Sequence, residues 1–310
     1  GCSPVSAGAG RAVTRLILPL TLVAAALALL APSGAVAGRS DVLLALLVLA
    51  TALGIPWSEL TALRSRAATI ALLSIAPLVV LAAFAWALGH AFGSFTRDGV
   101  VAVGLSSSEV ASVGLTALAG ADATVALGAV AGSLVLAALA GPVAIGWLAG
   151  GHGHPHGGSG QLLARFALVV LAPLCAGVAV RSVRASGAWL ARRDDERDGI
   201  AALTVIALVY ASLSGTHGSH GLGSALAASV CFCAGSAVLG WAWHARAAAP
   251  DPTTAVPGAL AIGMRDFAVA AALASQAFGT RAAVVPGVYG VVMLVAGTGF
   301  VTLVRRRRRR

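Results

Sequence analysis

The apolar residues of this chain fall into ten long runs, and the short stretches between them carry most of the charge. A helix that spans a membrane needs about 20 mostly apolar residues, because its length must match the hydrocarbon thickness of the bilayer. The pattern therefore predicts an all-α polytopic membrane protein. We expect ten transmembrane helices near residues 13–31, 41–56, 68–92, 98–120, 122–149, 161–181, 199–215, 221–244, 257–278 and 282–304.

The ten runs form two sets of five, and the second set repeats the first after a shift of about 154 residues. The shift moves Pro19 onto Pro173 and Ser112 onto Asp266. Because five is odd, the second set must cross the membrane in the opposite orientation. We expect a first five-helix repeat, a second and inverted five-helix repeat, and a basic cytoplasmic tail, in residues 1–160, 161–304 and 305–310.

A polar interruption divides the fourth run, and a charged one divides the ninth. The fourth contains three consecutive serines before Glu109, and such hydroxyls compete for backbone hydrogen bonds and weaken a helix. The ninth contains Arg265 and Asp266 directly after Gly263 and Met264. Interrupted helices at matching places in inverted repeats are typical of secondary transporters, which bind their substrates near the middle of the membrane.

Four charged residues lie within or between adjoining runs, where each costs roughly 2.5 to 3.5 kcal/mol on insertion scales. They are Glu109, Asp122, Arg265 and Asp266. Asp122 stands where the fifth run begins, so it is best interpreted as a cap on that helix. Arg265 has two open interpretations: an internal ion pair with Glu109 or Asp122, or a group that binds an anion.

The arginines are distributed unevenly between the two sides. Sixteen lie on the side of the termini and three on the opposite side, which places both termini in the cytoplasm. The mixed-charge segment 182–198 is expected to be a solvated linker between the halves. The net charge of +10 is then explained by a basic face against anionic lipid, and no nucleic acid partner is expected.

Nothing in the runs has the pattern of an enzyme, because no cluster of His, Cys and Asp and no phosphate-binding loop is present. Three histidines alternate with other residues in the glycine-rich loop 151–160, and we interpret this loop as a flexible hairpin rather than a metal site. No metal and no cofactor is expected.

The stretch 111–122, followed by an apolar run that ends at Gly141-Pro142, resembles the fourth and fifth spans of the bile acid:sodium symporter family. Gly263-Met264-Arg265-Asp266 is similar to that family's Gly-Met-Gln-Asn motif in the ninth span. The resemblance extends over the order of all ten spans. It implies a panel domain made of spans 1, 2, 6 and 7 beside a core domain made of spans 3–5 and 8–10, in which broken helices cross.

The same resemblance implies a multi-pass carrier in a bacterial inner (plasma) membrane, which moves organic anions together with sodium by alternating access. The sodium ligands of the family are replaced here, since carbon side chains cannot supply the hard oxygen atoms that sodium needs. We therefore expect the usual sodium sites to be lost. The replaced positions are Leu72, Val113, Ala126, Val130, Ala261 and Arg265.

The sequence thus predicts a secondary active transporter of a small organic anion that is proton-coupled or uncoupled. Arg265 would act as a tethered cation in place of sodium. Two alternatives stay open: a cation/proton exchanger that uses the intramembrane acids, and a membrane sensor or scaffold without transport. The expected substrate-binding residues are Ser106, Ser107, Ser108, Ser112, Thr116 and Arg265, and the expected ion-coupling residues are Glu109, Asp122 and Asp266. The oligomeric state is left open.

Overall fold

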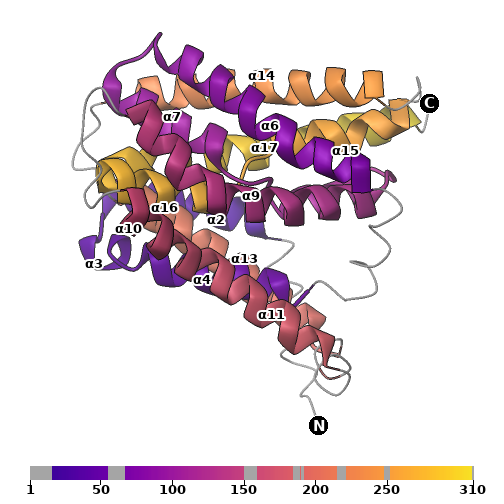
Figure 1. The fold of residues 1–310 in the computed structure, drawn as a ribbon, viewed down its shortest axis with the longest axis horizontal. Coiled ribbons are helices and arrows are strands. Elements are labelled where there is room, and N and C mark those ends of the chain that lie inside the picture. Colours follow the sequence, from indigo (N-terminus) through magenta and orange to yellow (C-terminus); the bar gives the residue numbers. More distant parts are fainter. Residues whose placement is uncertain are drawn as a thin grey trace.

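The computed structural model describes residues 16–54, 67–149, 159–183, 189, 192–214, 221–247 and 252–308. Within these ranges the secondary structure is helical, apart from one isolated β-bridge. Most of the helices run along the long axis of the molecule (Figure 1). The all-α class predicted from the apolar runs is confirmed.

The helices of the first half lie where the apolar runs predict them, and the fourth run is divided in two. Pro77 and Pro142 lie inside helices without ending them. The helices are α2 (Ile17–Leu30), α3 (Gly34–Ala37), α4 (Ser40–Ala52), α6 (Ala67–Gly89), α7 (Ser94–Leu105), α8 (Ala111–Leu118) and α9 (Ala123–Ala149).

The second half follows the same order, and its ninth run is also divided in two. Its elements are α10 (Ser159–Phe166), the π-helical turn η2 (Ala167–Leu171), α11 (Ala172–Ser182), α13 (Asp194–Leu213), α14 (Leu222–Ala247), α15 (Pro252–Gly263), α16 (Phe267–Phe278), the 3₁₀ turn η3 (Thr280–Ala283) and α17 (Val284–Arg308). The π turn precedes Pro173, which cannot donate a backbone hydrogen bond to the preceding turn.

One expectation about the connection between the halves is wrong in part. Residues 194–198 are not linker but the first turn of α13, where three acids favour the positive end of the helix dipole. Arg197 bridges Asp194 at 2.6 Å and Asp198 at 2.7 Å and so holds this turn together. The helix therefore begins before the apolar run does.

Five of the described helical segments are long and apolar enough to cross a membrane: 67–89, 123–148, 160–182, 222–242 and 280–304. Three further apolar helices are shorter: α2, α4 and α16. These lengths and compositions are those of a polytopic membrane protein. The histidines of the loop 151–160 lie outside the described residues.

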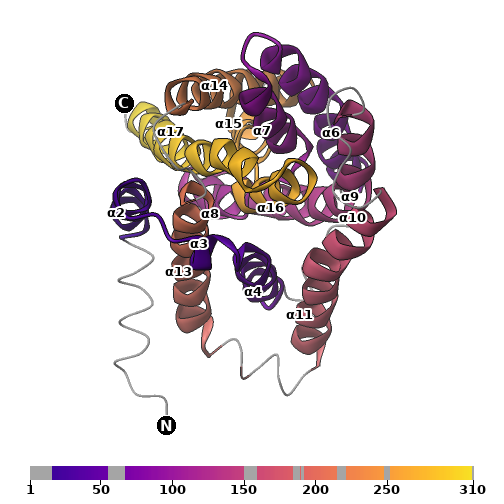
Figure 2. The same cartoon turned by 90° about the vertical axis from the view of Figure 1, so that its left-hand side faces the viewer.

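The helices pack in two groups. In one group, α13 packs against α2 and α4, and α11 packs against α4. In the other, α6 packs on α7 and α9, while α14 packs on α15 and α17. Figure 2, which looks along most of the helices, shows the first group below the second, with α16 and α8 between them. The two broken spans therefore lie inside the molecule.

Small residues allow the helices of the second group to approach closely, as is usual in membranes. A Cβ atom on Gly104 of α7 would lie 2.6 Å from the Cβ of Ala85 and 2.7 Å from the carbonyl oxygen of Leu81, both in α6. On Gly240 of α14 it would lie 2.6 Å from the carbonyl oxygen of Gly258 in α15. No larger residue fits at these contacts without moving the backbone.

The contact at Gly104 predicts the result of a matched pair of substitutions. We expect Gly104→Ala to lower the free energy of unfolding by about 1–3 kcal/mol, because the added methyl group overlaps α6. Gly114→Ala is the control, since no atom lies within 4 Å of its added methyl group. Thermal unfolding of the purified proteins in detergent measures the difference. Equal stability of the two variants would contradict the close packing.

Candidate functional site

The first break lies between α7 and α8. Helix α7 ends at Leu105, and Ser106 turns into extended backbone with φ −73° and ψ 169°. The Ser106 hydroxyl donates a hydrogen bond to the carbonyl oxygen of Val103 at 2.8 Å, so the side chain occupies an acceptor at the end of the helix. Ser106, Ser107 and Ser108 are all buried.

The second break lies between α15 and α16. Helix α15 ends at Gly263, and α16 begins after Asp266. One carboxylate oxygen of Asp266 accepts hydrogen bonds from the N–H groups of Ala268 at 2.9 Å and Val269 at 3.0 Å. Asp266 is therefore the N-cap of α16, where a negative charge is stabilised by the helix dipole.

The two breaks are joined by an antiparallel bridge between Ser108 and Arg265. The N–H of Glu109 donates to the carbonyl oxygen of Met264 at 2.9 Å, and the N–H of Asp266 donates to the carbonyl oxygen of Ser107 at 2.7 Å. Each interruption thus provides backbone partners for the other. Two helices that are far apart in the sequence meet through their extended segments.

The bridge fixes which residues occupy equivalent places in the two breaks. Ser108 and Arg265 are 157 residues apart, and the same separation relates Glu109 to Asp266. The same separation relates the donors of the two hydrogen bonds of the bridge, Glu109 and Asp266, and their acceptors, Ser107 and Met264. Around the bridge, Glu109 therefore stands where Asp266 stands in the other break, whereas the shift of 154 taken from the apolar runs pairs Asp266 with Ser112.

Two hydroxyl groups complete the backbone hydrogen bonds of the bridge. The N–H of Ser108 donates to the hydroxyl oxygen of Ser133 in α9 at 2.9 Å. The N–H of Arg265 donates to the hydroxyl oxygen of Tyr289 in α17 at 3.0 Å, and Tyr289 donates in turn to the carbonyl oxygen of Gly263 at 2.8 Å. In each half, the helix that follows the broken span (α9 or α17) thus supplies the hydroxyl that accepts this hydrogen bond.

Arg265 is only 1% exposed, so its guanidinium is enclosed by protein. Its Nη1 atom donates a long hydrogen bond of 3.4 Å to the Ser108 hydroxyl, and its Nε atom has no partner. Among the described residues Arg265 forms no ion pair, so the internal ion pair with Glu109 or Asp122, one of the two open interpretations, is not found. Glu109 is also buried, and its Oε2 atom lacks a hydrogen-bond partner.

Ser112 and Thr116 line one face of α8, one helical turn apart. Both are fully buried, and neither hydroxyl has a hydrogen-bond partner. Asp122 lies apart from this group. It is half-buried and accepts hydrogen bonds from the N–H groups of Thr124 at 3.0 Å and Val125 at 3.4 Å, so the predicted helix cap is confirmed.

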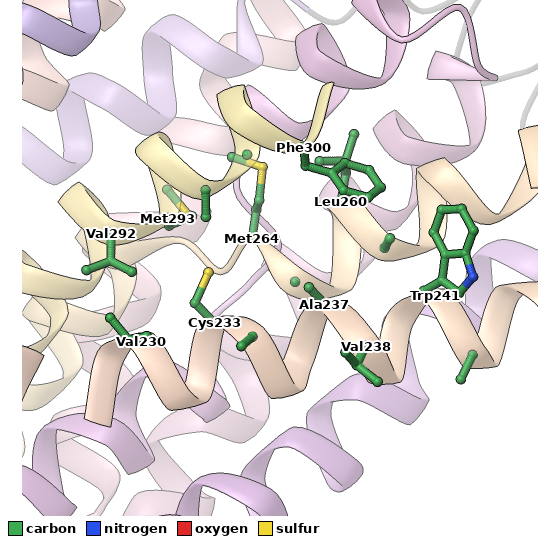
Figure 3. A pocket seen from close by; sticks show the side chains of 16 residues that line it. Val230, Cys233, Ala237, Val238, Trp241, Leu260, Met264, Val292, Met293 and Phe300 are labelled. Carbon is green, nitrogen blue, oxygen red and sulfur yellow. The ribbon is translucent and has the colours of Figure 1, made fainter. Parts of the chain in front are cut away.

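An apolar cavity of about 500 Å³ adjoins the second break between α14, α15 and α17. Figure 3 shows Met264 pointing into it beside Cys233 and Met293. Arg265, the next residue, does not line this cavity. The cavity is therefore separate from the polar group around Arg265.

The sequence profile of one family, described as the SBF-like CPA transporter family, matches residues 17–296. This is most of the chain. The chain belongs to the SBF-like CPA transporter family. The resemblance to bile acid:sodium symporters is thereby confirmed, and the protein is assigned to a family of membrane transporters. The chain matches no curated protein.

The transporter thus brings together most of the residues that the sequence indicated, which we call the crossing site. It consists of Ser106, Ser107, Ser108, Glu109, Ser112, Thr116, Arg265 and Asp266. Sequence reasoning missed the roles of Ser133 and Tyr289. The available signal was a hydroxyl-bearing residue within an otherwise apolar run, because such a hydroxyl needs a hydrogen-bond partner. In the described part of the chain, no group of His, Cys, Asp and Glu side chains is placed to hold a metal ion.

The double hydrogen bond of Tyr289 predicts a specific loss of stability. Tyr289→Phe leaves the buried N–H of Arg265 without this partner, while the carbonyl oxygen of Gly263 keeps a hydrogen bond of 3.3 Å from the Ser236 hydroxyl. Since a buried unsatisfied group costs about 1–3 kcal/mol, we expect a clear fall in the unfolding temperature. Tyr210→Phe is the matched control, because the Tyr210 hydroxyl makes one hydrogen bond, of 2.6 Å to Ala31, at an exposed place. A Tyr289→Phe protein as stable as the control would show that the hydroxyl does not support the break.

Proposed function

We propose that this transporter moves a small organic anion by alternating access and binds it at the crossing site. The observation that carries the proposal is a group of buried polar atoms without partners. Arg265 Nε, Ser112 Oγ and Thr116 Oγ1 all lack hydrogen bonds although they are enclosed by protein. Buried polar groups are nearly always satisfied, so an unfilled set marks a place for an occupant.

The chemistry of this set favours an anion. The Nε–H of a guanidinium can only donate, and the guanidinium carries a permanent positive charge. Two hydroxyl groups on α8 can donate as well. A carboxylate placed among these donors would receive charge-assisted hydrogen bonds, which are about twice as strong as neutral ones.

The arrangement of the helices supports the alternating-access part of the proposal. The group of α2, α4, α11 and α13 would be the panel domain, and the remaining long helices would be the core domain. In this proposal the chain crosses the membrane ten times in two inverted sets, with both termini in the cytoplasm. The core would move against the panel and expose the crossing site to one side at a time.

Sodium coupling is disfavoured by the residues around the bridge. Ala126, Val130 and Ala261 are buried apolar residues at positions where the resemblance predicts sodium ligands. In the proposal, Arg265 supplies the positive charge that sodium would bring. Coupling would then pass through protonation of Glu109 or Asp266, the two acids at equivalent places in the breaks.

One observation favours a second candidate function, a cation/proton exchanger. The crossing site contains two carboxylates and one guanidinium, so it is formally negative when all three are charged. In this alternative Glu109 and Asp266 would carry the ion, and Arg265 would only adjust their affinity for protons. The two candidates differ in what the loss of Arg265 does.

Arg265→Gln tests the role of the guanidinium while keeping a polar side chain. If Arg265 binds the anion, we expect its affinity to fall by roughly 100-fold, because truncating one partner of a buried charge pair costs about 2–5 kcal/mol. Thermal-shift titration with a panel of small carboxylates measures binding, and uptake into proteoliposomes measures transport. Arg281→Gln, at an exposed position in η3, is the control. Intact anion binding in Arg265→Gln would refute the proposal, and proton-linked cation flux surviving in it would favour the exchanger.

The replaced sodium ligands predict transport without sodium. We expect anion uptake into proteoliposomes to continue when sodium is replaced by a large organic cation and the pH gradient is held constant. Dissipating the pH gradient should stop accumulation, because a proton is the remaining coupling ion. Uptake that collapses on sodium withdrawal alone would refute the tethered-cation role of Arg265.

A further inference from the structure

A polar cavity lies at the end of the molecule where α3 is found, between elements of the two helix groups. Its volume is about 180 Å³, and α4, α10, α13, α16 and η3 contribute to its wall. Figure 1 shows α3, α10 and α16 together at this end. The crossing-site residues do not line it. Its wall includes Asp41, Arg165, Ser212, Gln276 and Thr280.

Asp41 connects three helices at this cavity. One of its carboxylate oxygens accepts two hydrogen bonds from Arg165 of α10, at 3.0 Å from Nε and 2.6 Å from Nη2. The other accepts a hydrogen bond from the Gln276 amide of α16 at 3.1 Å. Asp41 itself stands in the first turn of α4. The carboxylate thus ties α10 and α16 to α4 of the proposed panel domain.

Helix α16 links this contact to the crossing site. It begins at the cap residue Asp266, and Gln276 lies in its last turn before Gly279, whose φ of 91° ends the helix. A helix of 12 residues is a rigid rod of about 18 Å. A displacement of Gln276 away from Asp41 therefore also moves the half of the crossing site that α16 carries.

The cavity is partly open to solvent, and some of the buried polar atoms in its wall lack hydrogen-bond partners. Both features are expected where side chains change their contacts. The Arg165 side chain is 61% exposed, whereas the Asp41 side chain is 21% exposed. The Gln276 Oε1 and Ser212 Oγ atoms are buried there without hydrogen-bond partners. Water and small solutes can thus reach the ion pair from outside while the crossing site stays closed.

We infer that Asp41, Arg165 and Gln276 form the latch of an access gate, and that the polar cavity is the entrance that this latch closes. This inference rests on the proposed transport function. Breaking the contact between Asp41 and Gln276 lets α16 separate from α4 and α10. The crossing site then opens to the side of the entrance, which is the side opposite the termini.

The gate is tested by thiol accessibility of the full-length protein in intact cells. Ser112→Cys places a reporter at the crossing site, in a background where the native cysteines are replaced by alanine. A charged methanethiosulfonate that cannot cross membranes is added outside. We expect slow labelling with the latch intact and roughly tenfold faster labelling in Gln276→Glu, Asp41→Asn and Arg165→Gln, since losing about 1.4 kcal/mol of latch stability shifts the equilibrium that much.

Matched controls separate the gate from a general loosening of the fold. Asp198→Asn breaks an exposed ion pair with Arg197 at the opposite end of α13 and should leave labelling slow. Size-exclusion profiles show whether each variant is folded. Among the latch variants, Arg165→Gln is expected to disturb folding least, because the Arg165 side chain is mostly exposed. Ser212→Cys, in the wall of the entrance, shows that the reagent reaches the cavity.

The outcomes distinguish the gate from the transport function. Labelling of Ser112→Cys that stays slow in all latch variants, while Ser212→Cys is labelled, overturns the gate. Labelling that is already fast with the latch intact overturns it too. Because labelling reports access and not transport, faster labelling in the latch variants supports the gate even if no anion uptake is found, and the missing uptake then refutes only the proposed function.

Discussion

The structure depends on satisfying backbone polar groups where no water is available. In a bilayer each unpaired N–H or carbonyl group costs several kcal/mol, so a broken helix is tolerated only if protein replaces the lost hydrogen bonds. Here each break replaces those of the other, through the bonds from Glu109 to Met264 and from Asp266 to Ser107. Neither break is stable without its counterpart, which explains why two segments so distant in the sequence must meet. The bridge thereby brings the buried side chains of Ser108 and Arg265 together.

On the two sides of this bridge the hydrogen bonds that support the backbone are alike, but the two central residues differ. Glu109 and Asp266 occupy equivalent places, and the hydroxyls of Ser133 and Tyr289 accept from the central N–H group on either side. The central residues themselves differ, since one is Ser108 and the other is Arg265. The backbone of the two breaks therefore supplies the framework, and the guanidinium of Arg265 opposite the hydroxyl of Ser108 gives the bridge a permanent positive charge.

The sequence was sufficient for the helices, because long apolar runs and rare charges carry a strong signal in a membrane protein. It located both breaks and the Asp122 cap. It was not sufficient for the bridge between Ser108 and Arg265, because that contact depends on how the two breaks meet in the fold. The role of Tyr289 and the contact of Asp41 with Gln276, 235 residues away, depend on tertiary packing that no local pattern encodes. From the sequence, Asp41 is an ordinary acidic residue in the first turn of a helix. Only the fold brings α16 beside it.

The charges at the crossing explain why anion binding and proton uptake would be linked in the proposed mechanism. Arg265 cannot lose its charge, so only Glu109 and Asp266 can adjust the total. One carboxylate oxygen of Asp266 accepts hydrogen bonds from two N–H groups of α16, and the Oε2 atom of Glu109 has no hydrogen-bond partner. An anion that enters beside two ionised carboxylates would leave an excess of negative charge in a medium of low dielectric constant. A proton on Glu109 removes part of that excess and turns its oxygen into a further donor. Binding of the anion and protonation of Glu109 therefore favour each other, and by linkage the preference is mutual.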